Sequence, residues 1–205
     1  MSTDLLIEIG TEELPPKALQ LLSDAFTRGV AQGLKKAGLQ TGDVQSYATP
    51  RRLALLINDV PDAQPDRDVE RKGPSLKAAY DADGNPTKAV QGFARSCGVT
   101  VGELEQQQTD KGTWLVFKAK EKGQPVSELV PGIVDQSLAG LPIPKRMRWA
   151  DSDAEFVRPV HWVVMMHGKK VIDGVVLGVA SSNKTRGHRF HANKEIALSL
   201  SLIHI

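Results

Sequence analysis

Three acidic side chains near the amino terminus, Glu8, Glu12 and Glu13, have the chemistry of an acid–base pair or of a cation site. Paired carboxylates can move a proton, and carboxylate oxygens also bind divalent cations. Their positions offer a simpler interpretation, because Glu8 lies at the end of an apolar run and the other two stand where a helix is expected to begin. Helix amino ends favour acids. The spacing therefore favours a structural role.

Two histidines and one cysteine are the other side chains with reactive or metal-binding chemistry. His188 and His191 are three residues apart, but a zinc site needs three or four ligands, and no cysteine or acid lies close to them in sequence. Cys97 falls on the apolar stripe of an expected helix, which favours a core thiol over a nucleophile. The sequence has no Walker-type phosphate loop, no dinucleotide-binding glycine motif and no nucleophile elbow. We predict neither catalytic nor metal-binding residues.

Three clusters of basic residues remain as candidates for RNA binding. The arginine guanidinium can form two hydrogen bonds to a phosphate, while a neighbouring aromatic ring can stack on an unpaired base. Trp149 directly follows the second cluster. The alternative is that Asp151, Asp153 and Glu155 neutralise that cluster and that the arginines tie loops together inside the fold. The residues alone leave both interpretations open. The RNA-binding candidates are Arg51, Arg52, Lys145, Arg146, Arg148, Arg186, His188 and Arg189.

The first cluster belongs to a predicted α/β unit over residues 1–60. Residues 5–9 alternate like a strand, and apolar residues recur at helical spacing from Leu19 to Ala37 before Gly38. A second short apolar run at 53–57 follows Arg51 and Arg52. The pattern predicts a strand, an amphipathic helix and another strand. Residues 61–73 carry charges and two prolines, so we expect a connection there.

The other two clusters belong to a predicted second α/β region over residues 74–191. It contains an expected helix from Pro86 to Cys97, a capping box at 100–103, a strand at 114–120 and a helix over 125–138. Apolar runs at 160–166 and 171–180, separated by a glycine turn, predict a hairpin. Residues 192–205 end in apolar residues without a polar closure, and we expect a truncated or artificial tail. The fold class is α+β, with mixed-sheet α/β units and amphipathic helices in two small subdomains.

Composition limits the class of protein. The chain has 205 residues, 40% of them hydrophobic, which suffices for one large or two small cores. The net charge of +2 indicates that any basic surface arises from local clustering. The lone cysteine excludes an internal disulfide, no signal peptide is visible, and no stretch approaches the roughly 20 apolar residues that span a bilayer. We expect a cytoplasmic protein without a membrane partner.

Five strings in order resemble the amino-terminal part of the beta subunit of bacterial glycine–tRNA ligase, the two-subunit glycyl-tRNA synthetase. They lie at residues 6–19, 50–54, 141–149, 156–161 and 186–190. The resemblance covers the chain from about Leu5 to Phe190. Family beta chains are several times longer, so it implies an amino-terminal fragment that lacks the anticodon-binding part.

The resemblance implies a non-catalytic RNA-binding and assembly region. In the family, an alpha subunit carries the class II catalytic core, two alpha and two beta chains assemble, and the whole enzyme uses ATP and magnesium to attach glycine to its tRNA. No cofactor is expected in this chain, and we expect it to be inactive alone. Two alternatives stay open: a stand-alone metal-dependent hydrolase using Glu8, Glu12 and Glu13 with a His188–His191 site, and a purely structural module whose arginines are internal braces.

Overall fold

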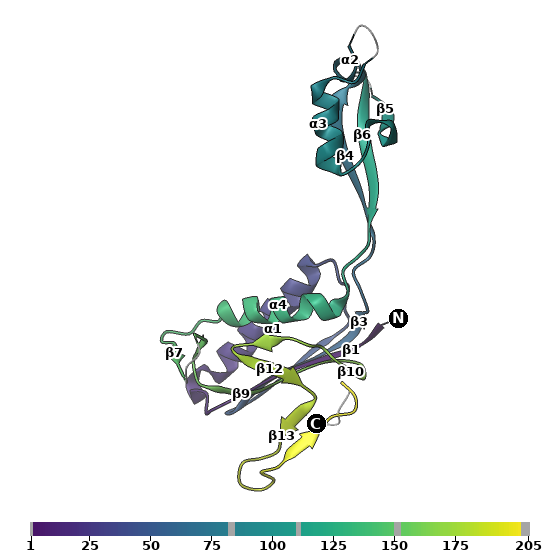
Figure 1. The fold of residues 1–205 in the computed structure, drawn as a ribbon. Coiled ribbons are helices and arrows are strands. Elements are labelled where there is room, and N and C mark those ends of the chain that lie inside the picture. The colour runs from purple at the N-terminus through teal and green to yellow at the C-terminus, as the bar shows by residue number, and fades with distance from the viewer. Residues whose placement is uncertain (1, 82–84, 110–111, 150–152, 202–205) are drawn as a thin grey trace. The chain divides into compact units, whose positions relative to one another are not determined.

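The computed structural model describes residues 2–81, 85–109, 112–149 and 153–201 (Figure 1). The chain forms two compact units. The main unit consists of Met1–Gln64 and Gln124–Ile205, and the inserted unit consists of Pro65–Gly123. Helices combine with parallel and antiparallel strand pairs, which confirms the predicted α+β class with two subdomains.

The main unit is built on one mixed sheet. The strand order is β11-β12-β9-β1-β3-β2, and β10 also pairs with β9. Among the strand pairs of the described residues, only β12–β9 is parallel. The sheet strands are β1 (Ser2–Thr11), β2 (Val44–Thr49), β3 (Arg52–Pro61), β9 (Val160–His167), β10 (Lys170–Val171), β11 (Val175–Val176) and β12 (Val179–Ser182). Two small ribbons accompany it, β7 (Met147–Arg148) with β8 (Glu155–Phe156), and β13 (Lys184–Arg186) with β14 (Glu195–Ala197).

Two helices cover one face of this sheet, α1 (Leu19–Lys36) and α4 (Val126–Ala139), and a single 3-10 turn, η1 (Pro16–Ala18), precedes α1 (Figure 1). Their apolar residues recur every four positions, so one stripe of each helix faces the sheet. Burying each of these side chains contributes about 1.5–3 kcal/mol. The fully buried side chains of the two helices include Leu22, Phe26, Val30, Leu34, Val126, Val130, Val134 and Leu138.

The central strand β1 positions the site, because it is buried on both faces. Ile7 pairs with Leu55 of β3 and with Met165 of β9, and these side chains join the core under the helices. Successive side chains alternate between faces, so Leu6 and Glu8 lie on the opposite side. There Leu6 packs with Leu56, Val164 and Met166, and Leu198 packs against them.

The inserted unit has a three-stranded sheet in the order β4-β6-β5 with helices packed against it. A small core contains Ala79, Val90 and Leu115. The predicted capping box is confirmed, because the amide of Thr100 donates to Oε2 of Glu103 at 2.7 Å. Its elements are β4 (Arg67–Ser75), α2 (Leu76–Ala79), α3 (Lys88–Cys97), η2 (Val101–Glu103), β5 (Glu105–Thr109) and β6 (Gly112–Glu121).

The structure corrects the expected boundaries. Residues 61–73 are not a connection, since most of them belong to β3 and β4, and β4 pairs with β6. The edge strand β4 is largely exposed, so its sequence is rich in charged residues, and this composition is also typical of a loop. The expected second region over 74–191 is shared between both units. Within the expected tail, residues 195–197 form β14 and Leu198 is buried, while residues 202–205 lie outside the described part.

Two further expectations differ in detail. The run at 171–180 is not one strand, because Leu177 and Gly178 have φ angles of 49° and 79° and turn the chain between β11 and β12. The hairpin at its start is confirmed, since β10 pairs with β9. Helix α3 begins at Lys88 with Thr87 as its cap, later than expected. Within the described residues, no helix combines the length and apolar character needed to cross a membrane.

Candidate functional site

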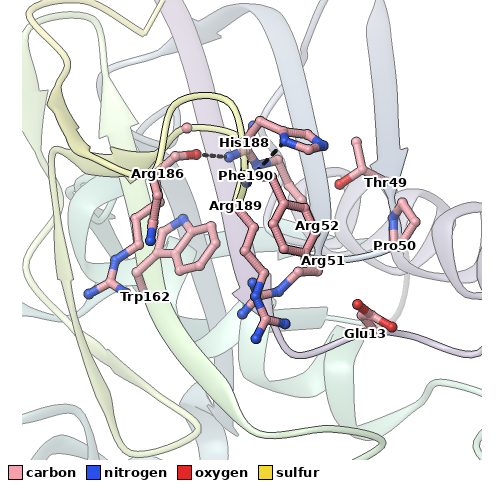
Figure 2. Close-up of a pocket in the computed structure, with 12 residues that line it drawn as sticks. Glu13, Thr49, Pro50, Arg51, Arg52, Trp162, Arg186, His188, Arg189 and Phe190 are labelled. Carbon is pink, nitrogen blue, oxygen red and sulfur yellow. Dashed lines mark hydrogen bonds between the residues drawn. The ribbon is translucent and has the colours of Figure 1, made fainter.

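A pocket of about 360 Å³ opens on the main unit (Figure 2). One side is formed by the turn between β2 and β3, at residues 49–52. The other side is formed by residues 186–190, which leave β13 and enter the loop that leads to β14. Trp162 of β9 lines the pocket as well, and so does Glu13. Segments that are distant in sequence therefore meet here.

Five of the eight predicted RNA-binding residues line this pocket. They are Arg51, Arg52, Arg186, His188 and Arg189. Antiparallel pairing places Gly10 beside both Arg52 and Trp162, which brings the first cluster close to the beginning of β9. The sequence did not indicate that these two clusters would meet.

The second cluster lies elsewhere, and its charges are largely engaged. Arg146 donates to the Ala139 carbonyl at 2.6 Å, which ties it to the end of α4. Arg148 forms ion pairs with Asp153 at 3.2 Å and Glu155 at 3.4 Å. Lys145 is exposed. The neutralising role expected for Asp153 and Glu155 is confirmed, while Asp151 lies outside the described residues.

Glu8 is a buried carboxylate beneath the pocket, with 4% of its surface exposed. Its Oε1 atom accepts hydrogen bonds from Trp162 Nε1 and Thr185 Oγ1, each at 2.5 Å. Arg52 Nε lies 3.2 Å from the same oxygen, as an ion pair without hydrogen-bond geometry. The second guanidinium arm of Arg52 donates to the Arg186 carbonyl. The charge of Arg52 is thus compensated, and its contacts hold β13 against the sheet.

Glu12 compensates Arg51 in a similar way. Its Oε1 atom lies 3.0 Å from an Arg51 amino group and 2.9 Å from Nε2 of His161. Partial desolvation acts to raise the pKa of Glu12, but the His161 hydrogen bond and the charges of Arg51, His161 and Arg189 outweigh it and lower that pKa. Glu8 and Glu12, two of the three acids first considered for catalysis, are therefore engaged with basic partners.

Trp162 lies directly over Gly10, and only glycine fits there. A Cβ atom on Gly10 would come within 1.9 Å of the indole ring. The guanidinium carbons of Arg52 and Arg186 lie 5.8 and 5.9 Å from the centre of the same ring, within cation–π range. The absence of a side chain at Gly10 thus allows the indole to pack against the backbone of β1. The two guanidinium groups in turn lie against the indole ring.

The loop beyond β13 is held by its own backbone. The Gly187 amide donates to the Lys194 carbonyl at 3.1 Å, and the Ala192 amide donates to the His188 carbonyl at 2.9 Å. Nδ1 of His188 accepts from the amides of Phe190 and His191, at 3.2 and 3.3 Å.

Two guanidinium groups at the pocket carry no partner charge in direct contact. Arg186 and Arg189 are exposed, and within the described residues neither guanidinium forms a hydrogen bond or ion pair. Their close contacts are with rings, Trp162 for Arg186 and Phe190 at 5.7 Å for Arg189. Phe190 itself is 82% exposed. This side of the pocket therefore presents free positive charge beside an uncovered aromatic ring.

No metal-binding geometry accompanies these residues. In the described part of the chain, no group of three or more His, Cys, Asp or Glu side chains could hold a metal ion. The rings of His188 and His191 approach each other, with centroids 4.6 Å apart, but Glu8 and Glu12 have other partners.

Sequence reasoning did not single out Trp162, Thr185, His161 or Phe190. Phe190 was visible only as an aromatic residue beside Arg189. The role of Trp162 depends on Gly10 and Glu8, which strand pairing brings beneath it from more than 150 positions away. No local pattern in the sequence carries that information.

Comparison with known proteins gives a consistent result. The family model described as glycyl-tRNA synthetase beta subunit matches residues 5–201. The chain is 58% identical over 193 residues to the glycine–tRNA ligase beta subunit of Marinobacter nauticus, covering 94% of this chain and 28% of that protein. It is 56% identical over 188 residues to the beta subunit of Hahella chejuensis, covering 92% and 27%. The chain thus spans less than a third of these relatives.

Proposed function

The chain belongs to the glycyl-tRNA synthetase beta subunit family, and we propose that it binds tRNA through the pocket between residues 49–52 and 186–190. The observation that carries the proposal is the pair of exposed guanidinium groups, Arg186 and Arg189, which have no anionic partner in direct contact. Such groups bind phosphate and release its counterions. The charges of Arg51 and Arg52 are compensated, and Arg52 helps to position Arg186 because it donates to the Arg186 carbonyl.

The proposal for the whole enzyme follows the family resemblance. Two chains of this kind join two alpha subunits in the cytoplasm, and the assembly attaches glycine to its tRNA with ATP and magnesium. The described residues do not offer a magnesium site, since no suitable group of ligands exists among them. Following the family resemblance, we assign the activation of glycine to the alpha subunit, and we assign tRNA binding and assembly to this chain.

The first test separates RNA binding from assembly. The immobilised chain is incubated in one experiment with alpha subunit and in another with glycine-specific tRNA. Retention of tRNA without alpha subunit is expected, and replacing Arg186 and Arg189 by alanine should weaken it. Retention of tRNA by the folded double variant at wild-type strength would overturn the assignment of this site.

The second test concerns catalysis. Glycine-dependent exchange of pyrophosphate into ATP measures formation of glycyl-adenylate. The chain alone should show none, and addition of alpha subunit provides the positive control. Exchange by the chain free of alpha subunit would contradict the assignment of activation to the other subunit.

The hydrolase alternative is disfavoured by the partners of its acids. A general base or metal ligand needs a carboxylate whose charge is not already paired, whereas Glu8 forms an ion pair with Arg52, and Glu12 forms one with Arg51. Stoichiometric zinc or manganese in the purified protein would revive that alternative. The structural alternative describes Arg51 and Arg52 well, but it leaves the exposure of Arg186 and Arg189 without a reason.

A further inference from the structure

We infer that the pocket takes up one unpaired nucleotide of an RNA strand, with its base against the Phe190 ring and its phosphate on Arg186 and Arg189. This inference rests on the proposed RNA binding and specifies which form of RNA the site accepts. It distinguishes an extruded or terminal nucleotide from the side of a double helix.

The shape of the site supports a single nucleotide. A concave pocket of about 360 Å³ lies at the small end of the range for small-molecule sites. Duplex RNA presents a wide, shallow minor groove and a deep major groove that side chains do not read, so its stacked bases do not enter such a pocket. An unstacked base has the size and the flat apolar faces that fit.

The exposed aromatic ring supports base stacking. Phe190 is 82% exposed, although apolar rings of this size ordinarily contribute to a core. The His188 ring lies 6.1 Å from it at a tilt of 52°, and the Arg189 guanidinium lies over it at 5.7 Å. Aromatic rings beside arginine are the usual platform for single-stranded nucleic acid.

The loop holds this ring in place without using the ring itself. The amide of Phe190 donates a hydrogen bond to His188 Nδ1, and the amide of Gly187 donates one to the Lys194 carbonyl. A Cβ atom on Gly187 would come within 2.2 Å of the Ala192 carbonyl, so the chain closes here because residue 187 is glycine. The side chain of Phe190 is thereby left available for a ligand.

Charge gives the nucleotide an orientation. Arg186 lies on one side of the pocket with Trp162, and Glu13 lies on the other side (Figure 2). A phosphate is attracted to the arginine side and repelled by the carboxylate. The base then lies toward Glu13, whose oxygens can accept hydrogen bonds from the exocyclic amino groups of adenine, guanine or cytosine.

The test compares single-stranded and duplex RNA with variants at Phe190. Fluorescence anisotropy measures the binding of a labelled single-stranded oligonucleotide and of the same strand in a blunt duplex, at one low salt concentration. Phe190→Leu removes the stacking face and keeps apolar bulk, and Phe190→Tyr keeps the ring. Losing one stacked base is worth about 1–3 kcal/mol, so Phe190→Leu should weaken single-strand binding about 5- to 150-fold. Phe190→Tyr should bind like the wild type.

The outcomes separate this inference from the proposed function. Equal single-strand affinity for Phe190→Leu and the wild type would overturn the inference. So would a duplex that binds as tightly as the single strand and responds equally to the substitution. If Arg186→Ala with Arg189→Ala weakens binding while Phe190→Leu does not, the RNA site stands and only the stacking is wrong. If neither variant changes binding, the proposed function fails as well. Because Phe190 is exposed, its substitution should leave thermal unfolding unchanged, which circular dichroism verifies.

Discussion

Arg52 Nε lies 3.2 Å from Oε1 of Glu8, and this contact joins two neighbouring strands of the sheet beneath the pocket. The Glu8 side chain is 6% exposed and that of Arg52 is 27% exposed, so water screens the pair only from the arginine side. Trp162 and Thr185 donate to the same carboxylate oxygen. One buried acid therefore connects β1, β3, β9 and β13.

Removing this acid should destabilise the main unit. Glu8→Ala leaves the Trp162 and Thr185 donors and the Arg52 charge without their acceptor, and breaking a buried pair in this way costs about 3–5 kcal/mol. Urea unfolding followed by circular dichroism measures the loss. Glu195→Gln is the matched control, because the Lys184–Glu195 pair is about half exposed on both sides and such pairs contribute about 0–1 kcal/mol. Equal effects of the two substitutions would contradict the central role of Glu8.

Adding one methyl group at Gly10 should disturb the pocket. Gly10→Ala pushes a Cβ atom into the indole of Trp162, and overpacking of this kind costs about 1–3 kcal/mol. The displaced ring should also weaken RNA binding, since Arg186 lies over it. Gly132→Ala is the control, because nothing lies within 4 Å of its Cβ position on α4, and it should stabilise the helix by about 0.5–1 kcal/mol. Thermal unfolding measures both variants, and Gly10→Ala should lower the unfolding temperature while Gly132→Ala should raise it.

Acid should remove the contribution of Glu12. The folded-state pKa of Glu12 lies below its ordinary value of 4.5, because the His161 bond and nearby arginines outweigh desolvation. A lowered folded pKa means that the stabilisation is complete above pH 4.5 and is lost as pH falls through the folded value. The difference in unfolding free energy between the wild type and Glu12→Gln should be largest at neutral pH and shrink below pH 4.5. If the difference in unfolding free energy instead grew below pH 4.5, the folded-state pKa of Glu12 would be raised and not lowered.

Salt should reveal the two free arginines. Arg186→Ala with Arg189→Ala should weaken tRNA binding and flatten the plot of log affinity against log salt by about one unit for each phosphate that the variant no longer neutralises. Arg28→Ala with Lys36→Ala removes the same charge from α1, away from this pocket, and controls for net charge. The site pair should change the slope and the α1 pair should not. Equal slopes for both double variants would locate the RNA contact elsewhere.

Helices and buried strands followed from local sequence, because their signals are local. The four-residue spacing of Leu22, Phe26, Val30 and Leu34 predicted α1, and the capping box at Thr100 and Glu103 predicted η2. Strand β4 was missed because an exposed edge strand has no apolar face to reveal it. Two units were expected, but their boundaries were misplaced for a similar reason, since the partner of β4 is β6, which lies far along the sequence.

The site was predicted in part. The basic clusters were visible in sequence, but local sequence does not say which arginines are paired. Arg51 and Arg52 look identical in the chain to Arg186 and Arg189, and only the folded arrangement places Glu12 and Glu8 against the first pair. Trp162 was missed because its support, Gly10, lies on another strand.

The junction of the inserted unit has a consequence for how this chain tolerates change in length. The amide of Gln64 donates to the carbonyl of Gln124 at 2.9 Å, and Ala63 bridges to Pro125, so the main unit is already closed by hydrogen bonds where the insert departs. Residues 65–123 are thus an inserted segment whose two ends are adjacent. Such a segment can be shortened, lengthened or exchanged in evolution while the sheet that carries Glu8 and the arginine pocket keeps its register.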